Sequence, residues 1–260
     1  MRRRFHVMVA TVAVAAVSVL SGCGRQRTLR PLFPWLFGMQ HVSAQLWVEP
    51  GMPDSTRAAL LRDLGLSRLR LLRWFGRLQS RPAVVVCVTA DRARAMGLRG
   101  AHAYTLGDRA ILVGPGGLRE RTLTHEWSHA ELYRRLGGLN AGAIARVPRW
   151  FDEGLASAVS EDTARAEANW RELESSGVPT PSLDEMVTMS QFADAKADYP
   201  PVRVDSLPHV NRVYATVAHE VLGWLRRAGP LAPVRLVDAM DSGESFGAAY
   251  MRLGGEASER

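Results

Sequence analysis

The pentapeptide His125-Glu126-Trp127-Ser128-His129 constrains the fold more than any other feature of the chain. It lies in residues 118–136, a stretch without proline or glycine that stops at Gly137-Gly138, and this pattern predicts one helix. Side chains four positions apart on a helix stand one above the other. Both imidazoles can therefore reach a single metal ion from the same face of the predicted helix.

The pentapeptide fits the H-E-x-x-H pattern, in which two histidines hold a zinc ion and the glutamate acts as a base. Imidazole nitrogens bind zinc at about 2.0–2.1 Å, which the spacing of His125 and His129 allows. Glu126 is next to the first histidine, so it points beside the metal rather than at it. This position suits a base that takes a proton from a water on the metal.

A catalytic zinc site needs a third protein ligand beside its water, and the segment 148–156 offers two candidates. Glu153 and Asp152 are both carboxylates on the helix predicted over residues 149–160. Neighbours on a helix point about 100° apart, so only one of them can face the metal. Gly154 and Ala156 are small, which lets two helices approach closely beside the metal.

Two motifs together, His125-Glu126-x-x-His129 and Trp150-Phe151-x-Glu153-Gly154-x-Ala156, resemble the gluzincin metallopeptidases, and most closely the peptidase MA-like group. The resemblance covers roughly residues 80–225. It implies a zincin-like fold, in which a small mixed sheet packs on the metal helix and an edge strand lines the cleft. It also implies one Zn²⁺ ion, Glu153 as third ligand and Glu126 as catalytic base. Glu153 follows His129 by 24 positions, which argues against the aminopeptidase branch.

A zinc peptidase also needs a donor for the oxyanion that forms during the reaction. In gluzincins this donor is often a Tyr or His of the C-terminal lobe, and Tyr214 opens a helix that resembles the Tyr-bearing one. His209 is the second candidate, and Tyr214 can instead be a core residue with a satisfied hydroxyl. A strand over His102–Thr105 or Ala110–Val113 is expected to hold the peptide by β-augmentation.

The N-terminus has the pattern of an export signal. Three arginines precede an apolar stretch, Val7 to Leu20, which is too short to cross a bilayer as a helix. Leu20-Ser21-Gly22-Cys23 resembles the lipobox of bacterial lipoproteins, which implies a signal peptide over residues 1–22 and acylation of Cys23. Gly24 in place of Asp favours the outer membrane, on the periplasmic side of the cell envelope. The alternative is a plain secretory signal with a chance cysteine.

The charge of the chain gives little support for a nucleic-acid partner. The net charge is +7, and three of these charges belong to the expected signal peptide. No basic stripe with interleaved aromatic residues stands out, as a nucleic-acid surface would need. The expected partners are therefore a peptide or protein substrate and, through Cys23, a membrane.

The remaining pattern indicates an α+β domain in which the sheet comes first and a helical lobe follows. Residues 23–40 are expected to be a tether and residues 41–260 one domain, with the sheet and the metal helix complete by about residue 137. Cys87 falls in an apolar run and is expected to be buried. Residues 176–209 are expected to be a long excursion with one short helix, capped by Ser182 and Glu185. Further elements are predicted as strands over 42–48, 83–88, 102–105 and 110–113, and as helices over 54–75, 149–160 and from 210 onward with a break at 229–230.

Three functional hypotheses follow from these patterns. The first is a zinc-dependent peptide-bond hydrolase anchored in the envelope. The second is a catalytically inactive zincin-fold lipoprotein that serves as a binding or scaffold module. The third is a zinc hydrolase that acts on another bond, such as a cell-wall amide, because only analogy of fold points to peptides.

Overall fold

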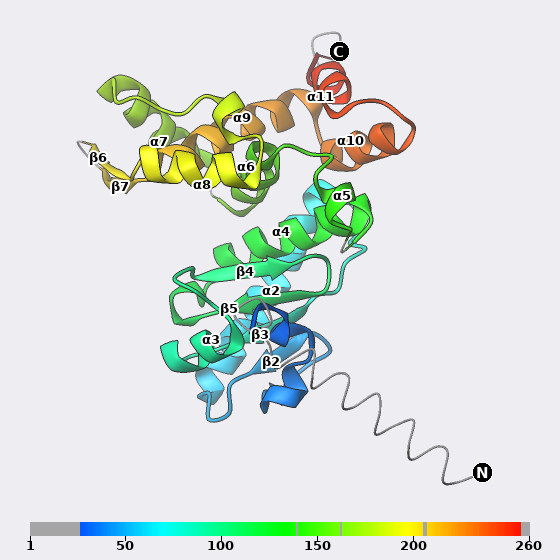
Figure 1. Cartoon of the computed structure of the whole chain (residues 1–260), viewed down its shortest axis with the longest axis vertical. Helices are drawn as coiled ribbons and strands as arrows, with labels where there is room; N and C mark the ends of the chain where they lie inside the picture. Colours follow the sequence, from blue (N-terminus) through cyan, green and yellow to red (C-terminus); the bar gives the residue numbers. More distant parts are fainter. Residues whose placement is uncertain (1–26, 139, 162, 205–206, 256–260) are drawn as a thin grey trace.

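The computed structural model describes residues 27–138, 140–161, 163–204 and 207–255. They form an α+β structure in which a mixed five-stranded sheet and its flanking helices come first and a mainly helical region follows (Figure 1). This order confirms the α+β prediction. The strands are β1 (Gln40–His41), β2 (Leu46–Val48), β3 (Ala83–Val86), β4 (Ala103–Leu106) and β5 (Ala110–Val113).

The strands lie in the order β1-β2-β3-β5-β4. The three central strands β2, β3 and β5 run parallel, and the two edge strands run antiparallel to them. A tight turn joins β4 to β5, and its Gly107 adopts a positive φ of 54° that glycine tolerates without strain. This arrangement places β4 at the edge of the sheet and β5 inside it.

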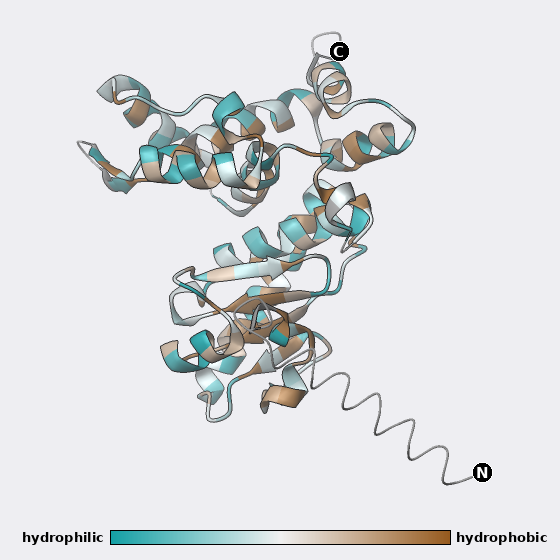
Figure 2. Cartoon of the chain, viewed as in Figure 1, coloured by the Kyte–Doolittle hydropathy of each residue, from teal (hydrophilic) through white to brown (hydrophobic). Residues whose placement is uncertain are grey.

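Both faces of the central strands are buried, so these strands are apolar throughout and appear brown in Figure 2. Alternate side chains of β3 and β5, such as Val84 and Ile111, pack toward α2 (Asp54–Phe75) and α4 (Glu120–Leu136). The opposite face, with Val85 and Leu112, packs toward α3 (Ala90–Met96). Cys87 is fully buried on this second face, as expected.

Helix α2 matches its predicted bounds and buries one narrow face. Leu60, Leu71 and Phe75 are buried, at spacings that share one helix face, whereas Leu61 is 41% exposed. Neighbours on a helix diverge by about 100°, which turns Leu61 toward solvent.

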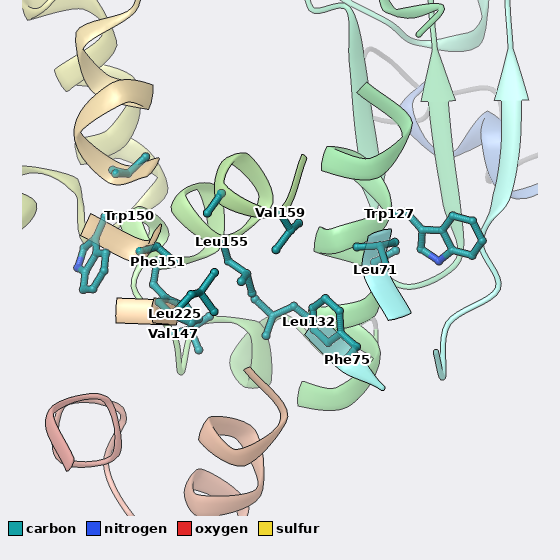
Figure 3. Close-up of a cluster of buried hydrophobic side chains, with 14 of the residues drawn as sticks. Leu71, Phe75, Trp127, Leu132, Val147, Trp150, Phe151, Leu155, Val159 and Leu225 are labelled. Carbon is teal, nitrogen blue, oxygen red and sulfur yellow. The ribbon is translucent and has the colours of Figure 1, made fainter. Parts of the chain in front are cut away.

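Helix α6 (Arg149–Ser160) lies between α4 and α9 (Arg212–Ala228) and joins the two parts of the molecule through one core. Figure 3 shows the row of apolar side chains that runs from α2 and α4 to α6 and α9. A Cβ atom on Gly154 would lie 2.5 Å from the Val217 carbonyl oxygen, so only glycine permits this approach. The predicted small residue thus serves the packing of α6 on α9.

The C-terminal half holds more regular structure than the sequence indicated. The predicted capping box of Ser182 and Glu185 is confirmed, and it starts η4 (Leu183–Met186). Residues 176–209 also contain α8 (Met189–Asp198) and a small hairpin of β6 (Val202–Val204) and β7 (Leu207–Val210). The other helices of this half are α5 (Ala141–Ile144), α7 (Thr163–Ser176), α10 (Ala232–Asp241) and α11 (Phe246–Gly255).

Residues 27–40 differ from the expected tether. They form two short 3₁₀ helices, η1 (Arg27–Leu32) and η2 (Pro34–Phe37), and then enter β1. This segment is rich in proline and apolar residues, and it packs on the folded domain. The contacts come from Pro34 and Met39, which are buried, and from Phe37, which is partly buried. The expected signal peptide and Cys23 lie outside the described residues. Among the described residues, no helix combines the length and apolar character that crossing a bilayer requires.

Candidate metal centre

Helices α4 and α6 bring three donor atoms of the expected ligands together. His125 Nε2 lies 3.3 Å from His129 Nε2 and 3.3 Å from Glu153 Oε2, and His129 Nε2 lies 3.7 Å from Glu153 Oε2. The two rings stand nearly perpendicular, at 83°. Among the described residues, these three side chains form the one group of His, Cys, Asp or Glu able to hold a metal ion in this way.

The spacing of the three donor atoms fits a tetrahedral ion. Ligands about 2.0–2.1 Å from a tetrahedral centre are separated from one another by roughly 3.4 Å. The two separations of 3.3 Å and the third of 3.7 Å bracket this value. The side chains would therefore need only small adjustments to hold a zinc ion, and three protein ligands would leave a fourth position for water or substrate.

The two carboxylate oxygens of Glu153 have different surroundings. Oε1 accepts a hydrogen bond from Arg149, four residues earlier on α6. Oε2 faces the histidines, is buried, and accepts no hydrogen bond from the described residues. Burial alone would raise the pKa of Glu153, but the contacts with the two histidines and Arg149 outweigh it and hold the pKa well below its usual range. A buried, ionised carboxylate needs a positive charge beside it, which either a metal ion or a proton on the facing histidines can supply.

Asp152, the competing candidate for third ligand, contacts the other nitrogen of His129. Its Oδ1 lies 2.6 Å from His129 Nδ1, and its Oδ2 accepts hydrogen bonds from Tyr133 and Arg149. This contact leaves His129 Nε2 directed at Glu153. Metal-binding histidines commonly pair their second nitrogen with a carboxylate, which fixes the tautomer and the ring orientation.

The buried acids also change the protonation of His129. Burial alone would lower its pKa, but the charges and hydrogen bonds of Asp152 and Glu153 outweigh this and raise the pKa to about 10. Without a metal ion, His129 therefore carries a proton at neutral pH. A metal ion and this proton compete for the same nitrogen.

Glu126 lies beside the donor atoms rather than among them, as its place in the pentapeptide predicts. Its side chain is 9% exposed and lines the same cleft as the three candidate ligands. The hydroxyl of Thr105, on β4, lies 2.7 Å from Glu126 Oε2 and 2.8 Å from the Glu126 backbone oxygen. The edge strand thus positions the carboxylate that is expected to act as base.

The donor atoms open on a cleft of about 950 Å³ between the sheet and the helical region. One wall comes from β4, through Ala103, Tyr104 and Thr105, and the floor comes from α4 and α6. The opposite wall comes from residues 187–196 on and before α8. In the described part of the chain no strand pairs with the outer side of β4, whereas β5 lies between β3 and β4.

Tyr214 lies in the first turn of α9 and lines this cleft. Its ring is edge-on to His125, with centroids 6.3 Å apart, and packs on Phe192. Its hydroxyl has no hydrogen-bond partner among the described residues, which differs from the alternative of a satisfied core tyrosine. His209 is exposed on β7 and lines a different cavity, on the other side of Tyr214.

Sequence reasoning missed three residues that organise this centre: Arg149, Tyr133 and Thr105. Arg149 follows Pro148 and is the first residue of α6. Its guanidinium pairs with the carboxylates of Asp152 and Glu153, which lie three and four positions further along the helix. That spacing is visible in the sequence. Tyr133 also lies four residues after His129, whereas Thr105 reaches α4 only through the fold of the sheet.

Comparisons of the chain with protein-family models, with curated proteins and with solved structures find no match.

Proposed function

We propose that the protein is a zinc-dependent peptide-bond hydrolase of the gluzincin type, with a zincin-like fold. The proposal is carried by one observation. Three donor atoms, from His125, His129 and Glu153, converge beside Glu126 in a cleft that an edge strand borders. The cleft holds a candidate residue for each chemical role in hydrolysis, which favours an enzyme over an inactive module.

A bound zinc ion would supply a Lewis acid that polarises a carbonyl and lowers the pKa of water to roughly 7. The Glu126 carboxylate takes a proton from the attacking water while the oxygen of that water bonds to the carbonyl carbon of the peptide. Glu126 then passes this proton to the amide nitrogen as the carbon–nitrogen bond breaks. Thr105 holds the Glu126 carboxylate in place for both transfers.

Tyr214 is our proposed donor to the oxyanion. Burial raises its pKa above the usual range, with the nearby Glu153 charge acting in the same direction. The hydroxyl therefore keeps its proton at neutral pH and can donate a hydrogen bond to an oxygen that gains negative charge.

The substrate that fits this cleft best is an extended peptide. The exposed side of β4 can add a strand in β-augmentation, with main-chain hydrogen bonds that do not depend on sequence. Val187, Met189 and Phe246 give the cleft apolar walls for side chains of the peptide. Strand β5, the other sequence candidate, is enclosed on both sides by neighbouring strands and cannot serve.

The proposed location is the cell envelope, with acylated Cys23 as a membrane anchor and the domain on the periplasmic side of the outer membrane. The support is the sequence pattern of residues 1–24, which lies outside the described residues.

The Glu126→Gln variant tests the proposal, because it keeps the shape of the side chain and removes the base. Zinc content should stay at the parent level, and the rate of peptide cleavage should fall about 10²–10⁴-fold. Cleavage of a mixed peptide library, followed by mass spectrometry, measures this. Undiminished cleavage by Glu126→Gln would contradict the mechanism. A zinc-loaded parent that cleaves no peptide would favour the scaffold module, or the cell-wall amide if muropeptides are cut instead.

A further inference from the structure

The N-terminal segment of the described chain is apolar on its inner and outer sides. Pro31 and Pro34 are buried against the domain, and Phe37 is partly buried there. Phe33 and Leu36 are instead 40% and 58% exposed. The domain therefore leaves these apolar side chains uncovered.

Leu29, Phe33, Trp35 and Leu36 together make the N-terminal apolar patch, with Trp35 54% exposed. These exposed apolar side chains lie within eight residues of one another. The rings of Phe33 and Trp35 meet edge-on at 5.6 Å, and Trp35 lies 6.0 Å from Trp47 on β2. Figure 2 shows η2, which carries Trp35 and Leu36, as a brown coil at the end of the molecule opposite the helical region.

Polar contacts fix the patch on the domain. Arg30 Nη1 donates to the Ala95 carbonyl oxygen at 2.5 Å, and its guanidinium lies over the Phe37 ring at 5.0 Å. Arg92, on α3, donates to the Phe37 carbonyl oxygen. The apolar side chains are thus presented from a fixed position on the domain surface.

Chain length ties the patch to the anchor. Cys23 precedes Arg27, the first described residue, by four positions. Four residues span at most about 14 Å when fully extended. If Cys23 is acylated, as the proposed function holds, its lipid chains keep the patch within reach of the headgroup region of the bilayer. Tryptophan, phenylalanine and leucine are the residues that bind this region in interfacial segments.

We propose that the N-terminal apolar patch inserts into the headgroup region of the anchoring membrane, as a second contact beside acylated Cys23. The lipid chains hold the protein at the membrane, and insertion of the patch adds apolar burial and gives the domain a fixed orientation. The patch lies beside β2, and two strands separate β2 from β4 in the sheet. Docking through the patch therefore turns the candidate active-site cleft away from the bilayer, toward soluble or wall-borne peptides.

The test uses the anchored chain purified from membranes and vesicles of phosphatidylethanolamine and phosphatidylglycerol. Lipids brominated near the headgroup quench tryptophans that insert among them. Parent emission should drop when brominated lipid replaces ordinary lipid, and the Trp35→Tyr variant should lose most of this drop. Trp170→Tyr is the matched control, because Trp170 lies on α7, stacked on His219, and its loss should leave the quenching unchanged.

The outcomes separate the patch from the anchor. Co-sedimentation with vesicles but equal quenching in the parent and Trp35→Tyr would overturn docking and leave the anchor standing. A chain that fails to co-sediment would overturn both. Trp35 emission that shifts with protein concentration in detergent, without lipid, would assign the patch to a second copy of the chain and overturn docking.

Discussion

Two glutamates, both buried on helices that share a core, have opposite surroundings. Glu131 on α4 is fully buried, and its oxygens accept hydrogen bonds from the backbone amides of Gln79 and Ser80, from the Ser80 hydroxyl and from Arg135. Glu153 on α6 has one oxygen on Arg149 and one that accepts nothing from the described residues.

The difference shows why burial alone does not identify a functional carboxylate. Glu131 is satisfied by the protein, so its charge serves to hold the residues before β3 against α4. Glu153 leaves an ionised oxygen facing two histidines, which is costly unless a cation completes it. The first glutamate should therefore control stability, and the second should control metal binding.

Glu131→Ala should produce the largest change in stability. It leaves the Arg135 guanidinium buried without its carboxylate and strips two backbone amides of their acceptor, a loss of about 3–5 kcal/mol. Urea unfolding of the metal-free chain measures it. Zinc bound per folded chain should not change. A variant with parent stability but reduced zinc would reverse the roles assigned to the two glutamates.

Asp152→Asn should weaken zinc binding about 10–100-fold, because the amide cannot replace the charge that orients His129. Competition with a zinc chelator gives the affinity. Tyr133→Phe is the milder companion, since it removes one donor to Asp152 and leaves its carboxylate on His129. Equal affinities for Asp152→Asn and the parent would show that His129 is oriented by other contacts.

Zinc affinity should rise about tenfold per pH unit through neutral pH, because zinc must displace the proton of His129. The pKa of His129 is raised from 6.5 to about 10 in the metal-free chain, so the gain continues until pH approaches that value. The contacts that favour protonated His129 also stabilise the metal-free fold. Their contribution to the unfolding free energy is complete below pH 6.5 and is lost as pH rises through about 10. Calorimetry in buffers of different ionisation enthalpy counts the released proton; a count of zero would refute the competition.

Thr105→Val should have the smallest effect. It removes the hydroxyl that bonds to Glu126 and keeps the shape of the β4 side chain, which should cost about 0.5–1.5 kcal/mol of unfolding free energy. Zinc content should match the parent, because the Thr105 hydroxyl bonds to Glu126 and not to a candidate ligand among the described residues. Loss of zinc in this variant would mean that β4 and the metal centre are coupled more tightly than these contacts indicate.

Local patterns in the sequence predicted much of the fold. The bounds of α2 and α6 and the two glycines that stop α4 follow from periodicity, proline and glycine, which act within a few residues. Helix α7 and the packed segment 27–40 were missed. Their apolar residues are few or irregularly spaced, and what holds them is contact with elements far along the chain.

The candidate site divides in the same way. His125, Glu126 and His129 follow from one pentapeptide, because helix geometry sets their relation. The choice between Asp152 and Glu153 needs the way in which α6 packs on α4, and this packing joins residues that are not neighbours on one helix. Thr105 and Tyr214 come from elements that reach α4 only in the folded chain. The family resemblance suggested Tyr214, whereas no spacing rule in the sequence finds Thr105.

The most direct test of the account is zinc content by elemental analysis on four proteins: the parent, His129→Ala, Glu153→Ala and Glu131→Gln. The account predicts about one zinc per chain in the parent and in Glu131→Gln, and none in the other two variants. Zinc retained by Glu153→Ala would move the third ligand elsewhere. A parent that binds no zinc, even after reconstitution, would contradict the metal centre and the hydrolase built on it.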